Sequence, residues 1–85
     1  MTNLEIYDRE FIKLFKVKKE DLPTLKYRGI KAWDSVAHMD LMNEFEEIFD
    51  IQISTVDMLD FTGYEKGKEV LARYGVEIGE TDISI

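Results

Sequence analysis

The 85-residue chain contains no cysteine, one histidine and one proline. This composition excludes several classes of site and function. Without cysteine there can be no disulfide, no thiolate nucleophile and no cysteine-ligated metal. The single histidine, His38, cannot form a metal site that needs several histidines. No apolar run approaches the roughly 20 residues of a membrane-spanning helix. The first residues do not combine a basic segment with an apolar block, so we expect no secretory signal and a cytoplasmic protein.

Basic residues are also in the minority, with 11 Lys and Arg against 18 Asp and Glu and a net charge of −7. A surface of this sign repels nucleic-acid phosphates and anionic lipid, which argues against binding to nucleic acid or to a membrane. It attracts basic patches on partner proteins. The chain is long enough for one small domain with a hydrophobic core, but a deep, water-excluding cleft is hard to build at this size. A binding or carrying role is therefore favoured over an enzyme.

Helix start signals occur at four places along the chain. Three are boxes in which a hydroxyl residue is followed three positions later by an acid: Thr2 with Glu5, Ser54 with Asp57, and Thr62 with Glu65. The fourth is Asp34, the expected N-cap of an acidic helix whose apolar positions from Val36 to Phe49 have helical spacing. The pattern predicts an all-α fold, with three longer helices and one short third helix.

A long loop, residues 16–33, connects the first two helices, and loops of this length are usually functional or packed across the core. We expect one helical turn at residues 18–21. Five apolar residues with neither helical nor strand spacing are predicted to pack across the bundle: Leu22, Leu25, Tyr27, Ile30 and Trp33. Gly75 is expected to end the last helix after Tyr74. The predicted domain spans residues 1–75, with residues 76–85 as a flexible tail.

Ser35 follows Asp34 at the start of the acidic helix, where a hydroxyl is accessible and the helix dipole favours a phosphate group. Other interpretations of this serine remain open. Asp-Ser at a helix start is common capping chemistry. His38 lies three residues further on the same side of the helix, so the Ser–His pair of a minimal serine hydrolase is another interpretation.

The order of these elements resembles the acyl carrier protein family over about residues 4–74. Asp34-Ser35-Val36 is similar to the Asp-Ser-Leu attachment motif of that family, and residues 46–50, Glu-Glu-Ile-Phe-Asp, are similar to the acidic end of its second helix. The resemblance implies an acyl-carrier-protein-like four-helix bundle. It also implies that a phosphopantetheinyl transferase joins Ser35 to 4′-phosphopantetheine taken from coenzyme A, with Asp34 helping to position the metal ion of the transferase.

The thiol of that arm would carry an acyl or aminoacyl group as a thioester, in fatty acid, polyketide or nonribosomal peptide biosynthesis. Val36 and Met39 are then candidate contacts with the loading and processing enzymes, with core packing as the alternative. Asp40, Glu46 and Glu47 are candidate docking acids for basic patches on those enzymes, with a merely solvated helix face as the alternative. A carrier of this kind is expected to be a monomer.

The sequence departs from the family pattern in two regions. Val36 replaces the usual leucine, and the run from Trp33 to Met39 is more similar to stand-alone carriers of specialised pathways. The last helix has Gly67 and Lys68 where bulkier apolar residues are common, which predicts a shallow cargo pocket and a short or aminoacyl cargo. The alternative function is an unmodified acidic helical adaptor that binds a basic partner protein.

Overall fold

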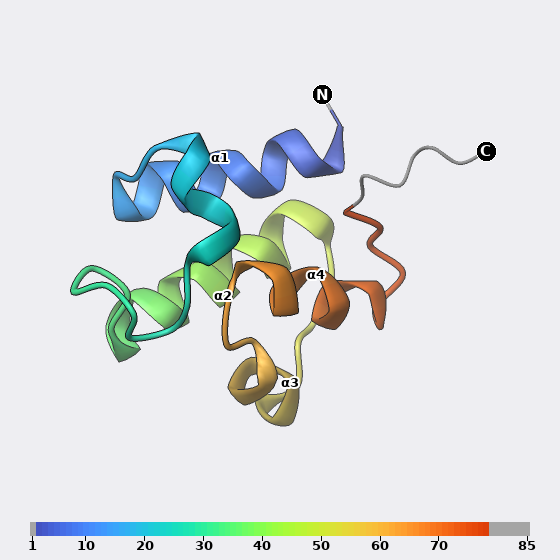
Figure 1. Cartoon of the computed structure of the whole chain (residues 1–85). Coiled ribbons are helices and arrows are strands. Elements are labelled where there is room, and N and C mark those ends of the chain that lie inside the picture. The colour runs from blue at the N-terminus through green and yellow to red at the C-terminus, as the bar shows by residue number, and fades with distance from the viewer. Residues whose placement is uncertain (1, 79–85) are drawn as a thin grey trace.

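The computed structural model describes residues 2–78, and over this range the chain folds into helices joined by loops. The elements are α1 (Asn3–Phe15), η1 (Lys19–Thr24, a 3-10 helix), α2 (Ser35–Phe49), α3 (Thr55–Asp60) and α4 (Tyr64–Ala72). Within these residues there is no β-strand, only an isolated antiparallel bridge between Lys26 and Gly63. The predicted all-α class is therefore confirmed, and η1 covers most of the helical turn expected in the long loop (Figure 1).

Two of the predicted capping boxes start helices as expected. The Glu5 amide donates to the Thr2 hydroxyl at 3.1 Å, and the Thr2 amide donates to the Glu5 carboxylate at 2.8 Å. The Asp57 amide donates to Ser54 Oγ at 3.2 Å at the start of α3. Each bond satisfies an amide that has no partner within its helix, so these hydroxyl residues define where α1 and α3 begin.

The predicted N-cap of α4, Thr62, is wrong by one residue. Gly63 is the N-cap, and no side chain caps this helix. The Thr62 carbonyl accepts a hydrogen bond from the Tyr27 amide at 2.9 Å, and the Tyr64 amide donates to the Leu25 carbonyl at 3.0 Å. Pairing with the long loop holds this segment extended, so α4 begins only after Gly63.

The end of α4 and the residues after it differ from the expectation in two ways. The helix ends at Ala72, two residues before the predicted end, and a turn follows in which Gly75 takes a φ of 82°. The C-cap is Arg73, so Gly75 does not end the helix itself as predicted. Glycine enters the left-handed region at low cost, and Gly75 forms part of the turn that follows. The predicted tail, however, begins too early, because Val76 and Ile78 are buried in the core. The rest of that tail, residues 79–85, lies outside the described residues.

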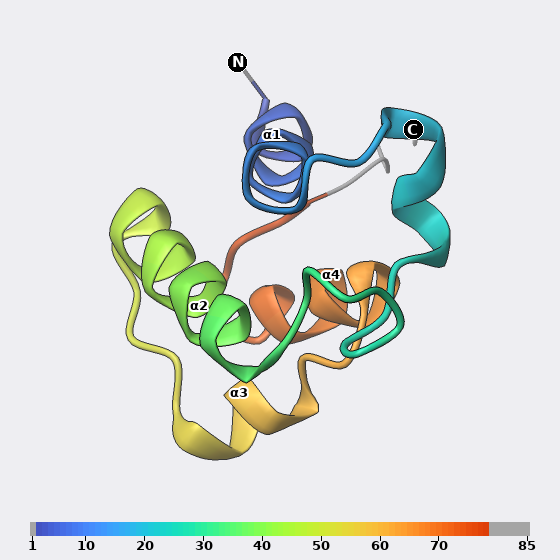
Figure 2. The same ribbon diagram turned by 90° about the vertical axis from the view of Figure 1, so that its left-hand side faces the viewer.

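The helices α1, α2 and α4 surround a common interior (Figure 2). Aromatic side chains make up much of the core there. The Tyr7 ring stacks on Phe45 with centroids 5.2 Å apart, and Phe11 meets Trp33 edge-on at 5.5 Å. All four side chains are fully buried, and Phe61 joins them from the residue after α3. The loop crosses this core as predicted, since three of its apolar residues are buried and two are partly buried: Leu22, Leu25 and Trp33, then Tyr27 and Ile30.

Candidate functional site

Ser35 is the first residue of α2, and it is exposed. Asp34 before it is the N-cap, as predicted: its carboxylate accepts the Ala37 amide at 2.9 Å. The Asp34 carbonyl accepts the His38 amide, also at 2.9 Å, as the first bond of the helix. The Ser35 hydroxyl therefore stands on the first turn of a capped helix, at its positive end.

Trp33 packs into the core, as predicted, and thereby anchors the chain just before this serine. Its side chain is fully buried and stacks on Phe15 with centroids 5.0 Å apart. The Trp33 amide donates to the Ile30 carbonyl at 3.2 Å, and the Trp33 carbonyl accepts the Arg28 amide at 3.0 Å. These bonds close a tight loop, so Ser35 follows a segment that is fixed to the core by its side chain and by its backbone.

A shallow hollow of about 330 Å³ lies at this loop. Its lining residues are Arg28, Ile30, Lys31, Trp33 and Asp34. The Arg28 guanidinium lies 5.4 Å from the centroid of the Tyr27 ring, and a hydrogen bond with Tyr27, helped by the charge of Asp34, raises the pKa of Arg28. The hollow thus offers two exposed cations beside the residue that precedes Ser35, and these could hold an anionic group attached there.

His38 is buried within the molecule, although it lies only three residues after Ser35. The Trp33 indole Nε1 donates to His38 Nδ1 at 2.9 Å, and His38 Nε2 lies 2.8 Å from the Met58 carbonyl. His38 thus contacts the loop through Trp33 and is not a surface residue. Both ring nitrogens are engaged, so neither is available to accept a proton from Ser35, and the Ser–His pair of the hydrolase interpretation does not form.

Exposed apolar side chains surround the start of α2. Val36 and Met39 are 70% and 46% exposed, which excludes the alternative of core packing. On α3, Val56 and Leu59 are each 74% exposed, and the contact between His38 and Met58 brings this helix alongside the start of α2. The sequence does not single out Val56 and Leu59, because apolar residues in a six-residue helix fit a core as well as a surface; their separation by three positions is the only signal.

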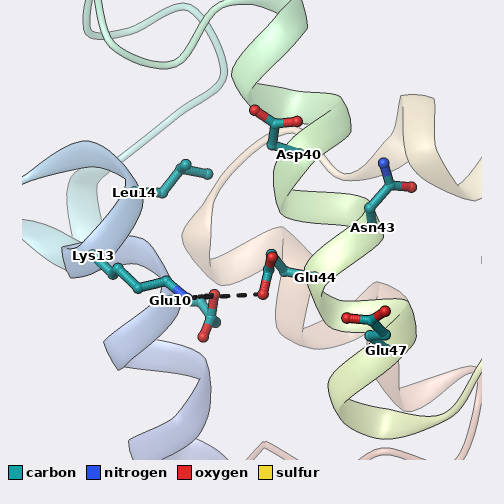
Figure 3. A pocket seen from close by; sticks show the side chains of 7 residues that line it. All are labelled: Glu10, Lys13, Leu14, Asp40, Asn43, Glu44 and Glu47. Carbon is teal, nitrogen blue, oxygen red and sulfur yellow. Dashed lines mark ion pairs between the residues drawn. The ribbon is translucent and has the colours of Figure 1, made fainter.

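Two of the three predicted docking acids line a groove between α1 and α2 that has a volume of about 410 Å³ (Figure 3). Asp40 and Glu47 are exposed there, and Glu44 adds a third carboxylate from α2. Lys13 of α1 balances part of this charge, because its Nζ lies 3.2 Å from Glu10 and 3.8 Å from Glu44. The groove therefore remains acidic.

Glu46 does not join this groove. Its carboxylate is half-buried and accepts a hydrogen bond from the Ile53 amide at 2.8 Å. This bond fixes the connection between α2 and α3, which gives Glu46 a structural task that the sequence did not suggest. The acidic run at the end of α2 is thus divided between a structural carboxylate and exposed ones.

Among residues 2–78 no group of three or more His, Cys, Asp or Glu side chains is arranged to hold a metal ion. No helix in this part of the chain has the length and apolarity needed to cross a membrane. Comparisons of the chain with protein-family models, with curated proteins and with solved structures give no match.

Proposed function

We propose that this chain is a carrier protein of the acyl carrier type, modified on Ser35 with 4′-phosphopantetheine from coenzyme A. The observation that carries the proposal is that Ser35 is exposed on the first turn of a capped helix. The two residues before it hold it in place, because Trp33 is buried and Asp34 is the N-cap. Within residues 2–78 the α-helices have 13, 15, 6 and 9 residues in chain order, with a long loop that contains η1 after the first, and this order supports the same assignment.

Two features near Ser35 suit a phosphodiester. The amides at the start of a helix and its dipole favour negative charge there. Arg28 and Lys31 line the adjacent hollow and supply opposite charges for the phosphate. Asp34 keeps α2 capped and, in this proposal, also helps to position the metal ion of the transferase that makes the bond.

The surroundings of Ser35 also suit brief contacts with several enzymes. Val36 and Met39 offer apolar area within one turn of the arm, and Val56 and Leu59 extend it onto α3. Asp40 and Glu47 lie further along α2, where they would attract basic patches and increase the rate of encounter. We propose that loading and processing enzymes bind here, with the carrier acting as a monomer rather than as an enzyme.

The cargo is proposed to be short or aminoacyl. Gly67 suggested a shallow pocket from the sequence, and the Tyr7 hydroxyl and the Phe61 ring occupy the space over this glycine. Close-packed aromatic side chains leave little room for a long acyl chain between α1, α2 and α4. The thioester and its cargo would therefore stay outside the bundle.

The test is to incubate the purified protein with coenzyme A and a broad-specificity phosphopantetheinyl transferase, and then to measure its mass. We expect one phosphopantetheine increment, which Ser35→Ala abolishes. Ser54→Ala is the matched control, because Ser54 is another exposed serine at a helix start and its removal should leave the increment intact.

An unchanged mass with every transferase tried would contradict the carrier and favour the acidic adaptor. The adaptor is kept as the second candidate because of the groove that contains Asp40, Glu44 and Glu47. Its binding to a basic partner would not depend on Ser35.

A further inference from the structure

His38 joins three segments that meet around the proposed attachment site. It belongs to α2, its Nδ1 accepts the indole N–H of Trp33 in the loop at 2.9 Å, and its Nε2 lies 2.8 Å from the Met58 carbonyl in α3. The ring is also packed against Tyr27, with centroids 4.7 Å apart, and against Phe61 at 6.1 Å. Only 8% of the residue is exposed, so water does not replace these partners easily.

The two hydrogen bonds define which nitrogen of the His38 ring carries a proton. An indole N–H can only donate, so His38 Nδ1 must carry a lone pair; a carbonyl can only accept, so Nε2 must carry the proton. His38 is therefore a neutral imidazole with one tautomer. An apolar side chain of similar volume would fill the space, but it would leave the buried indole N–H of Trp33 without a partner, which is costly. The Met58 carbonyl would keep only the Phe61 amide, at 3.3 Å.

The two hydrogen-bond partners of His38, Trp33 and Met58, belong to segments of the proposed recognition site around Ser35. Trp33 ends the loop two residues before the serine, and Met58 lies between Val56 and Leu59, the exposed apolar residues of α3. No residue of α3 is itself fully buried, so this helix depends on its few specific contacts for its position.

We infer that His38 is a positioning residue: its ring holds the attachment loop and α3 in one fixed relation to Ser35. Partner enzymes then meet the serine together with the apolar side chains of α2 and α3 as a single surface. The inference rests on the proposed function, because it concerns the recognition of the same site.

Two substitutions separate the two hydrogen bonds. His38→Asn keeps an acceptor near the position of Nδ1 and loses the contact with Met58, whereas His38→Gln keeps a donor near the position of Nε2 and loses the contact with Trp33. His38→Leu loses both. Val70→Ala is the control, because it removes buried methyl groups from α4 without removing a hydrogen bond from the loop, α2 or α3.

Two measurements are made on each folded variant. Hydrogen exchange followed by NMR reports the Trp33 indole N–H and the α3 amides, and steady-state kinetics with the transferase reports KM and kcat for the carrier. We expect His38→Gln to expose the indole N–H, His38→Asn to expose the α3 amides, and His38→Leu to do both. For His38→Leu we expect KM to rise at least about tenfold with kcat within about twofold, since one lost buried hydrogen bond corresponds to roughly tenfold and this variant loses two.

Val70→Ala should leave both KM and the indole N–H near their wild-type behaviour, although it lowers stability. A wild-type protein that is modified, together with His38 variants whose KM does not differ from that of Val70→Ala, would overturn this inference and leave the proposed function standing. A wild-type protein that no transferase modifies would overturn both.

Discussion

At the scale of single residues, Gly67 shows how a missing side chain shapes the interior. Glycine inside a helix costs about 1 kcal/mol relative to alanine, so it needs a compensating reason in the middle of α4. A Cβ built at Gly67 would overlap the Tyr7 hydroxyl and the Phe61 ring. The Tyr7 hydroxyl donates to the Tyr64 carbonyl at 2.6 Å across this gap, so α1 is joined to α4 where the helix has no side chain.

Gly67→Ala is therefore expected to destabilise the protein by about 1–3 kcal/mol, because the rings must move to admit the methyl group. Helix propensity alone predicts that alanine stabilises α4, so the sign of the change in the free energy of unfolding decides between the two effects. Urea unfolding followed by circular dichroism measures the free energy of unfolding. Glu69→Ala, on the exposed side of the same helix, is the control and should change it by less than about 0.5 kcal/mol. Equal or higher stability of Gly67→Ala would show that the rings do not close over this glycine.

The residues of the site differ in how far the sequence could predict them. Ser35, Asp34 and Trp33 have local signatures, a helix start and an aromatic residue at the end of a loop, and the structure places all three accordingly. The inward direction of His38 has no such signature, because its two partners come from a loop and from α3. Hydrogen bonds between distant segments depend on how the helices pack, which periodicity does not specify.

At the scale of elements, α3 is held against the end of α4 by a cluster of polar contacts. The Arg73 guanidinium donates to Asp57 at 2.6 Å and to Asp60 at 2.7 Å. The Tyr74 hydroxyl bonds to Asp57 and accepts the Ser54 amide at 2.9 Å. The hydrogen bond from Tyr74, followed by that from Arg73, lowers the pKa of Asp57, and the hydrogen bond from Arg73 lowers the pKa of Asp60.

These shifts give a definite dependence of stability on pH. Both pKa values are lower in the folded state, so the stabilisation is present above the ordinary Asp pKa of about 3.9 and is lost as the pH falls through the folded values. Arg73→Gln should lower the urea midpoint at neutral pH, speed amide exchange in α3, and reduce the loss of stability between about pH 5 and pH 2. Lys31→Gln removes a cation from the loop instead and should leave that acid dependence unchanged. An unaltered acid profile in Arg73→Gln would show that Arg73 does not hold these carboxylates.

Element boundaries show a similar division between local and long-range causes. The hydroxyls of Thr2 and Ser54 each accept an amide three residues along, which is a local bond, so their pattern correctly predicts where α1 and α3 begin. The box at Thr62 fails because backbone groups of Tyr27 and Leu25, nearly forty residues earlier, pair with this segment. Burial of Ile78 likewise follows from the position of α1, where Asn3 donates to the Glu77 carbonyl at 3.1 Å. Such pairing is set by the fold, and no short window of sequence contains it.

At the scale of the whole molecule, charge and apolar area are distributed around the proposed attachment site in a graded way. Val36 and Met39 lie within about one helical turn of Ser35 and are exposed, as are Val56 and Leu59 on α3. The acidic groove between α1 and α2 runs along α2 from Asp40 to Glu47 (Figure 3). Long-range attraction acts first on an approaching basic partner, and short-range apolar contact follows once it is oriented. This order allows fast encounter without tight binding, which a shuttle between several enzymes requires.

Reversing two charges of the groove tests whether this placement matters beyond the net charge. Asp40→Lys combined with Glu47→Lys changes the net charge from −7 to −3, and Glu20→Lys combined with Glu69→Lys makes the same change at exposed acids away from α2. With a transferase or loading enzyme that has a basic docking patch, stopped-flow association at low salt should slow about tenfold for the first pair and less than about threefold for the second. The first pair should also lose most of the salt dependence of the wild-type rate, because added salt screens the attraction that these carboxylates supply. Equal slowing by both pairs would mean that partners respond only to the total charge and that the groove has no special role in docking.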